Sequence, residues 1–377
     1  MAQKNASFKK KEHFLQLISG IAQEKILFCP IDVSKHFHVA IFHDIKGKAL
    51  CDFFDFSSSK IGFDFFIAKL EALLSSLSPQ IVFIGCEPTS IYYEGLMQNL
   101  HLRFKESLAP KFQLCILDPL AVKNNRHQHS LHFTKSDSID CAAIGDLLCR
   151  GLYSQAFFIS AESLQIKELS HSIHDYRKQL LRHWNRTLIT IDRVFPNLLI
   201  DYKDEAPICK CPLESSLLQD LLHISPDPVE LLELSVSDLI DLFHSQERRL
   251  GPKNAQKILS SAQRALLLAP NYRAVHLKTL SHQLDTLDFL KAQIESLTAE
   301  ICQLMACTSA RHLVKIAGNS EKLTADFLAA LSDANRFHSV EQVWKAAGLA
   351  PSLIQSGQAR QQPHISKTGS FYLRRAI

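Results

Sequence analysis

The stretch that decides the fold is ILFCPIDV at residues 26–33, an apolar run that carries the acidic residue Asp32 near its end. A short apolar run bounded by polar segments is typical of a buried β-strand. Two further strand-like runs follow at 38–43 (HVAIFH) and 49–56 (ALCDFFDF), and the IKGK segment between them favours a hairpin turn. The sequence therefore predicts an opening meander of three strands, with Asp32 late in the first.

Strands and helices alternate after this meander, as expected for a mixed α/β sheet. The expected elements are a helix near 61–76, a strand at 81–88 (IVFIGCEP), a helix near 91–100, a strand at 113–119 and a helix from about Ser136 to Gly151. We assign residues 1–155 to this first domain.

Residues 156–305 have the pattern of a helical arm. Apolar residues recur every three or four positions from Ile166 to Ile191 and again from Leu277 to Leu304, which is a coiled-coil-like pattern. The proline-rich segment between them, roughly 196–270, is expected to break into short helices and loops. We predict an antiparallel two-helix coiled-coil arm with an irregular tip, although an ordinary helical bundle fits the pattern equally well.

The last segment, 306–377, is expected to form a small, mostly helical C-terminal domain with short helices near 321–332 and 339–347. The length of 377 residues agrees with two or three domains, and 46% hydrophobic residues are enough for buried cores. The ten cysteines show no secreted framework and indicate a reducing cytoplasm. No apolar run reaches the ~18 residues of a membrane span, so we expect a cytoplasmic protein without membrane contact.

Two basic stretches stand out in a chain whose net charge is only +4: one lies between Asp118 and Asp137, and the other runs from Pro351 to the end. Both lack acidic residues, which suits contact with nucleic-acid phosphates. Either stretch alone could equally be a solvated surface. Their basic residues are Lys123, Arg126 and Lys135 in the first stretch, and Arg360, Lys367, Arg374 and Arg375 in the second.

Four acidic residues are placed where they could meet. Asp32 and Glu87 lie late in two predicted strands, and Asp137 and Asp140 share one face at the start of a predicted helix. Carboxylates that converge in this way repel one another unless divalent cations are bound, and oxygen ligands suit Mg²⁺. The order of a strand Asp, a hairpin, a strand-end Glu and a helical Asp pair indicates a ribonuclease-H-like (RuvC-like) fold. Each acid taken singly has an ordinary structural explanation, and Asp118 is a rival ligand.

Several short motifs occur in order along most of the chain. They are IDVSK at 31–35, GCEPTS at 85–90, DP at 118–119 with Lys123, Arg126 and KSDSID at 135–140, AGLAP at 347–351, QSG at 355–357, ISKTG at 365–369 and LRR at 373–375. In these motifs the chain resembles the bridge-RNA-guided DEDD transposases, bacterial insertion-sequence recombinases related to the pilin-gene invertases.

The resemblance implies a DNA transposase, an enzyme of phosphodiester transesterification. It implies that Asp32, Glu87, Asp137 and Asp140 are a Mg²⁺-binding tetrad and that Ser356 is the nucleophile. It also implies donor and target DNA and a noncoding bridge RNA as partners, with assembly into a homodimer or homotetramer. Lys367, Arg374 and Arg375 would contact DNA phosphates or offset charge in the transition state.

Two other functions are compatible with the same residues. One is a metal-dependent nuclease of the Holliday-junction-resolvase type, which would use the four acids and leave Ser356 idle. The other is an inactive relative that still binds nucleic acid, because the chain stops at Ile377, directly after the LRR motif, where the family normally continues.

Overall fold

The computed structural model describes residues 2–129, 136–196, 198, 211–307, 315, 320–331, 337, 339–352, 355–356, 359–360 and 364–377. Contacts within the chain divide it into two compact units, Met1–Phe158 and Ile159–Ile377.

The first unit is built on a six-stranded sheet of order β3-β2-β1-β4-β5-β6. Its strands are β1 (Ile26–Asp32), β2 (Phe37–Ala40), β3 (Phe54–Ser57), β4 (Ile81–Cys86), β5 (Lys111–Ile116) and β6 (Ser154–Gln155). The central strands β1, β4 and β5 are parallel, whereas β2, β3 and β6 each pair antiparallel with their neighbours. This mixed α/β sheet agrees with the predicted ribonuclease-H-like domain.

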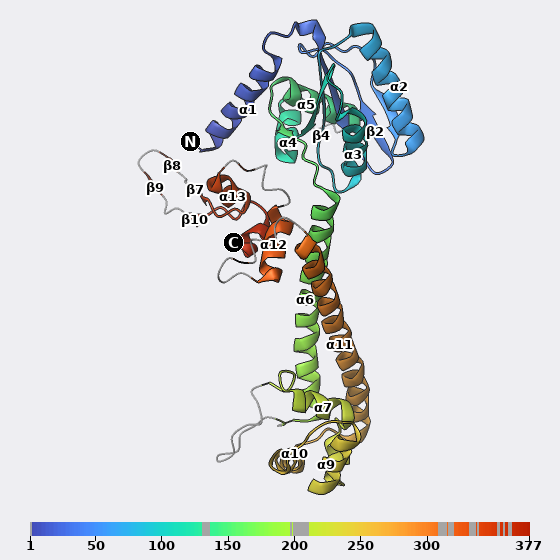
Figure 1. The fold of residues 1–377 in the computed structure, drawn as a ribbon, viewed down its shortest axis with the longest axis vertical. Helices are drawn as coiled ribbons and strands as arrows, with labels where there is room; N and C mark the ends of the chain where they lie inside the picture. The colour runs from blue at the N-terminus through green and yellow to red at the C-terminus, as the bar shows by residue number, and fades with distance from the viewer. Residues whose placement is uncertain are drawn as a thin grey trace. The chain divides into compact units, whose positions relative to one another are not determined.

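Helices cover both faces of this sheet (Figure 1). They are α1 (Ala2–Ile18), α2 (Lys60–Leu77), α3 (Tyr92–Phe104), α4 (Pro119–His129) and α5 (Asp137–Cys149), with a 3-10 turn at Gln23–Lys25. Alternate residues of β1 enter two separate cores, as the period of two in a strand requires. Leu27, Cys29 and Ile31 pack with α2 and α3, whereas Ile26 and Phe28 pack with α1, α4 and α5.

The predicted hairpin turn is confirmed, and Asp44 organises it. One carboxylate oxygen of Asp44 accepts from the backbone N–H groups of Lys46 and Lys48, at 2.8 and 2.9 Å. The predicted third strand at 49–56 is wrong in its first part, because β3 begins only at Phe54. Leu50 and Cys51 pack against the core beside α2, and only Ala49 forms an isolated bridge, to His43.

The hydrophobic pattern does not predict helix α4, because its sequence PLAVKNNRHQH is mostly polar. Its start is encoded locally. Asp118 accepts from the N–H groups of Leu120 and Ala121 at 2.9 and 3.0 Å, and Pro119 needs no N–H partner in a first helical turn. Capping therefore defines a helix that hydrophobic periodicity does not reveal.

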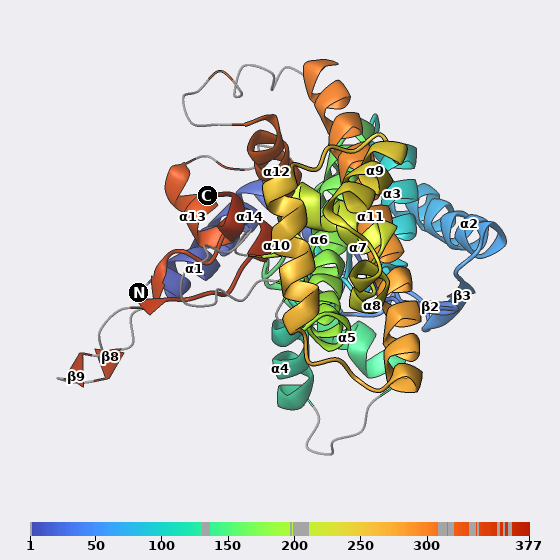
Figure 2. The ribbon, with the colours of Figure 1, turned by 90° about the horizontal axis from the view of Figure 1, so that it is seen from below.

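In the second unit the long helices α6 (Ala161–Val194) and α11 (Pro270–Cys307) lie side by side (Figure 1). The short helices between them are α7 (Ser216–Ile224), α8 (Pro228–Leu232), α9 (Val236–Ser245) and α10 (Pro252–Arg264). Figure 2 looks along the long pair, and these short helices share one apolar core with the adjoining parts of α6 and α11. The predicted breakage of the proline-rich segment is confirmed in the part that the structure describes.

The C-terminal part of this unit packs on the same two helices. Its elements are α12 (Glu321–Leu331), α13 (Val340–Ala346), β7 (Pro351–Ser352), β8 (Gln355–Ser356), β9 (Ala359–Arg360), β10 (His364–Ile365) and α14 (Phe371–Ala376). Ala325 and Ala329 of α12 bury against Ile166 and Ile173 of α6 and Ile301 of α11. The two predicted short helices are confirmed. Along the described ranges of both units, every helix is too short or too polar to cross a membrane.

Candidate functional site

Two of the predicted acids lie at one edge of the sheet. Asp32 is the last residue of β1, and Glu87 directly follows β4. These strands are parallel neighbours, and their register pairs Ile31 with Cys86. Asp32 and Glu87 are therefore next to each other at the carboxyl ends of adjacent strands.

Helix α5 brings the other two acids to this edge. The Ser136 hydroxyl caps the helix by accepting from the N–H of Ile139 at 3.3 Å, so Asp137 stands in the first turn, exposed, and Asp140 lies one turn on, buried. The helix crosses close to β1, where the Cys141 thiol donates to the Pro30 carbonyl at 3.3 Å.

Gly145 makes this approach possible. A Cβ atom at Gly145 would lie 2.6 Å from the Nε2 atom of His43 and 3.2 Å from Pro30. A larger residue would push α5, and with it both aspartates, away from β1.

All four acids line one pocket of about 580 Å³. The same pocket is lined by three basic side chains, Lys35, Lys123 and Arg126. The carboxylates therefore exceed the cationic groups by one. A cleft in which acids lie beside bases suits a cation and a phosphate bound together.

Asp140 and Arg126 form an ion pair within this pocket. The Asp140 side chain is 9% exposed and that of Arg126 is 19% exposed. Among the described residues, no three His, Cys, Asp or Glu side chains are grouped closely enough to hold a metal ion. The four carboxylates still supply the oxygen ligands that Mg²⁺ prefers, so the donor chemistry fits this ion.

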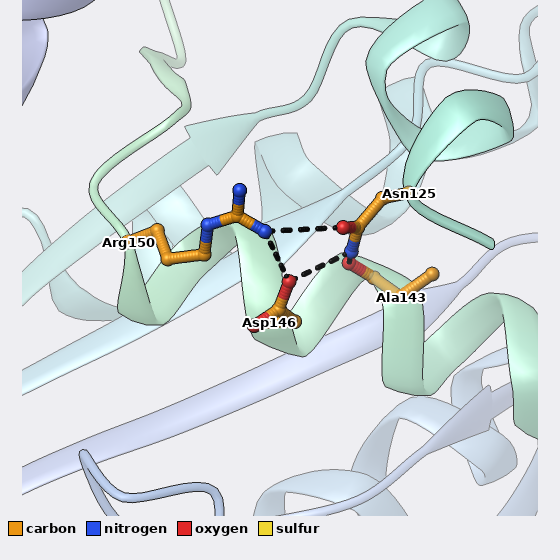
Figure 3. A network of polar contacts seen from close by, with 4 residues as sticks. All are labelled: Asn125, Ala143, Asp146 and Arg150. Carbon is orange, nitrogen blue, oxygen red and sulfur yellow. Dashed lines mark hydrogen bonds and ion pairs between the residues drawn. The ribbon is translucent and has the colours of Figure 1, made fainter. Parts of the chain in front are cut away.

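A polar network fixes α4, which carries Arg126, against α5 (Figure 3). The buried amide of Asn125 donates to the Ala143 carbonyl at 3.0 Å and to Asp146 at 2.9 Å. Arg150 closes the network by donating to Asn125 at 3.2 Å and to Asp146 at 2.7 Å. The sequence does not indicate these residues as part of the site, because Asn125 is a polar residue in a mostly polar segment and its burial has no signal in the hydrophobic pattern.

Asp118 and two cysteine thiols of the first unit, Cys86 and Cys141, are poor candidates for metal ligands. Asp118, the rival ligand, caps α4 through its carboxylate. Burial, with the Glu87 and Asp32 carboxylates nearby, raises the pKa of the Cys86 thiol to about 12. Burial also raises the pKa of the Cys141 thiol. Neither thiol is a ready ligand, since the thiolate is the form that binds metal.

The predicted DNA-binding residues have different surroundings. Lys123 lines the acidic pocket, whereas Lys135 lies outside the described residues. Ser356 and Arg360 lie in β8 and β9, which pair antiparallel, and the structure describes only their backbone. The Lys367 side chain is exposed.

The two arginines near the C-terminus hold parts of the second unit together. Arg374 donates to the carbonyls of Ala347 and Lys367, at 2.7 and 3.3 Å. Arg375 contacts the Nδ1 atom of His174 on α6. The structure therefore gives both residues a packing role that the motif did not indicate.

A mixed sheet with acids at its carboxyl edge, followed by a helical unit, is consistent with a ribonuclease-H-like domain. Two family models match the chain: a DEDD transposase model over residues 29–196, described as "Transposase", and a model over residues 310–377, described as "Transposase IS116/IS110/IS902 family". The chain belongs to the IS110-type DEDD transposases of insertion sequences. No curated protein matches it.

Proposed function

We propose that this transposase cuts and rejoins DNA with the hydroxyl of Ser356, assisted by Mg²⁺ held by Asp32, Glu87, Asp137 and Asp140. The observation that supports the metal site is the pocket that all four acids line together with Lys123 and Arg126. Family membership supports the recombination chemistry.

The three proposed domains divide this work. Residues 1–155 hold the metal, residues 156–305 form a coiled-coil arm that mediates dimer or tetramer assembly, and residues 306–377 carry Ser356. The facing apolar residues of α6 and α11 support the arm. Ser356 belongs to β8, which pairs antiparallel with β9, and this pairing supports a defined backbone position for the proposed nucleophile.

The reaction is a transesterification in two stages. The Ser356 oxygen attacks a backbone phosphorus atom, its proton passes to a base, and one bridging P–O bond breaks. One DNA end is then joined to the serine through phosphate, and the other end leaves as a hydroxyl after taking up a proton. Attack by a hydroxyl of the exchanged strand reverses these steps and releases the serine, so no external energy source is needed.

The residues around the pocket would orient the phosphodiester. Lys123 and Lys35 contribute positive charge at the acidic edge, where they can contact phosphate oxygens. When bound, Mg²⁺ supplies the charge that offsets the phosphate's own charge during attack. A noncoding bridge RNA would select the sequence by pairing with donor and target DNA. The protein would recognise the shape and the backbone of the paired nucleic acid.

One assay tests this proposal. The full chain is incubated with its flanking noncoding RNA, donor and target DNA and Mg²⁺, and DNA covalently attached to protein is measured. We expect an adduct that is lost in Ser356→Ala and retained in the control Ser352→Ala, which replaces a serine of strand β7. Omission of the RNA should abolish the adduct on specific sites.

Two other outcomes would overturn the proposal. Cleavage that persists in Ser356→Ala without any adduct would establish the resolvase-like nuclease, because only the four acids would then be needed. Binding of DNA without cleavage by the unmodified chain would establish the inactive relative.

A further inference from the structure

We propose that Arg126 is an exchangeable partner of Asp140: it neutralises this carboxylate when no cation is bound, and it turns to a DNA phosphate when a divalent cation takes its place. This inference rests on the metal site of the proposed function, and it assigns to one arginine the coupling between cation binding and DNA binding.

The first argument is the burial of Asp140. It is the only one of the four described acids that is buried, whereas Asp137 is exposed and Asp32 and Glu87 are partly exposed. A buried carboxylate without a positive partner is strongly unfavourable, because it loses hydration and gains nothing in return. Arg126 supplies that partner, and a divalent cation at the same acid would make the arginine redundant.

The second argument is the chemistry of the guanidinium. Arginine stays charged at all accessible pH values, and its planar fork of N–H donors matches a phosphate as well as a carboxylate. Arg126 therefore cannot leave Asp140 by losing its proton. Once it leaves, its positive charge needs another anion as a partner. The phosphodiester that enters the same pocket is such an anion.

The third argument is that the position of Arg126 on α4 does not depend on its ion pair with Asp140. Its neighbour Asn125 anchors α4 to α5 through Ala143 and Asp146, so the helix backbone is held independently of the Arg126–Asp140 pair (Figure 3). The long arginine side chain can then change partner while α4 stays in place. Lys123, one turn earlier on α4, lines the same pocket and extends the positive path for phosphate.

The first test measures cation binding to the full chain by Mn²⁺ electron paramagnetic resonance. We expect Arg126→Gln to bind Mn²⁺ about tenfold more tightly than the unmodified chain, because the cation then no longer competes with a guanidinium for the Asp140 carboxylate. The matched control is Arg103→Gln, which removes an arginine paired with Glu71 at 2.7 Å on the exposed surface of the same unit. This control should leave Mn²⁺ affinity unchanged.

The second test measures the salt dependence of binding to duplex DNA, with and without Mn²⁺. With Mn²⁺, we expect Arg126→Gln to reduce the slope of log K against log salt by about 0.9, the loss of one phosphate contact. Without Mn²⁺, the slopes of Arg126→Gln and the unmodified chain should agree. A slope difference that is the same in both conditions would overturn the exchange.

The outcomes separate this inference from the proposed function. If the unmodified chain binds Mn²⁺ and Arg126→Gln binds it no more tightly, the exchange is wrong and the metal site stands. If neither chain binds Mn²⁺, both fail. Should Arg126→Gln not fold by circular dichroism, Arg126→Lys keeps the charge but loses the fork, and we expect a smaller gain in Mn²⁺ affinity; no gain would overturn the exchange.

Discussion

The Nδ2 atom of Asn125 on α4 lies 2.9 Å from a carboxylate oxygen of Asp146 on α5, and this single amide joins the helix of the basic residues to the helix of the acids. Asn125 is only 3% exposed. Its amide also reaches the Ala143 carbonyl, and Arg150 closes the network from the C-terminal end of α5. The geometry of the pocket therefore depends on polar residues that do not line it.

Replacement of this amide should loosen α4. We expect Asn125→Ala to lower the free energy of unfolding of the first unit by about 1–3 kcal/mol, because the Ala143 carbonyl and the partly exposed Asp146 carboxylate lose a buried donor. Hydrogen exchange of peptides from α4 and α5 would measure it. The control is Asn99→Ala in α3, an exposed amide that donates to Gly95 at 2.7 Å and should cost under about 0.5 kcal/mol. Equal effects of the two variants would contradict the anchoring role.

The sequence predicted the sheet because its strands are continuous apolar runs. β1 and β4 lie almost wholly inside, so their composition alone identifies them. The order of Asp32, Glu87, Asp137 and Asp140 along those elements predicted that they would approach one another, and the structure places all four around one pocket. Whether they bind metal stays a prediction.

What could not be predicted depends on long-range contact. The pairing of Arg126 with Asp140 needs α4, and α4 is specified by its cap at Asp118 and not by a repeating apolar pattern. The packing of Arg374 on the Ala347 carbonyl joins residues 27 positions apart. A basic motif in a sequence does not distinguish such internal bonds from phosphate contacts.

Gly348 marks a tight backbone crossing in the C-terminal part. Its φ is +70°, and an added Cβ atom would lie 2.8 Å from the Arg374 guanidinium, 2.9 Å from the backbone of Lys367 and 3.0 Å from that of Thr368. The backbone N–H of Lys367 donates to the Gly348 carbonyl at 3.0 Å, so these segments cannot separate easily.

We expect Gly348→Ala to cost roughly 2–4 kcal/mol, as the sum of left-handed backbone strain and overpacking. Tryptophan fluorescence during urea unfolding would report it, because Trp184 and Trp344 both lie in the second unit. The control is Gly47→Ala in the first unit, where φ is +79° and nothing lies within 4 Å of the added Cβ atom. Because both tryptophans lie in the second unit, unfolding of this control is followed by far-ultraviolet circular dichroism. At Gly47, backbone strain alone should cost about 1–2 kcal/mol. An equal cost at Gly47 and Gly348 would contradict overpacking at Gly348.

A substitution at Asp137 can distinguish a role in catalysis from a role in stability. It is exposed in the first turn of α5, so Asp137→Asn should change the free energy of unfolding by no more than about 1 kcal/mol, through the helix dipole. As a metal ligand, Asp137 should be needed for DNA cleavage, and Asp137→Asn should lower the cleavage rate by at least about 10–100-fold. Glu162→Gln, a first-turn acid of α6, is the matched control. Full cleavage activity in Asp137→Asn would remove this residue from the tetrad.

His38 should make the first unit sensitive to acid. His38 is 2% exposed, and its Nδ1 atom accepts from the N–H of Ser34 at 3.3 Å. Burial lowers the pKa of His38 below its ordinary value of 6.5. Below pH 6.5 the unfolded chain therefore binds a proton at this position before the folded chain does. By linkage, the folded state loses stability as the pH falls from 6.5 towards the folded pKa of His38, and it keeps this stability above pH 6.5.

Replacement of His38 should flatten part of this pH dependence. We expect the drop in urea midpoint between about pH 7.5 and pH 5.5 to be smaller in His38→Gln, which removes the proton-binding ring, when unfolding is followed by far-ultraviolet circular dichroism. His43 is also buried with a lowered pKa, so part of the dependence should remain. The exposed His36 provides the control, since His36→Gln should keep the drop of the unmodified chain. If His38→Gln and His36→Gln behave alike, protonation of His38 is not what destabilises the fold in acid.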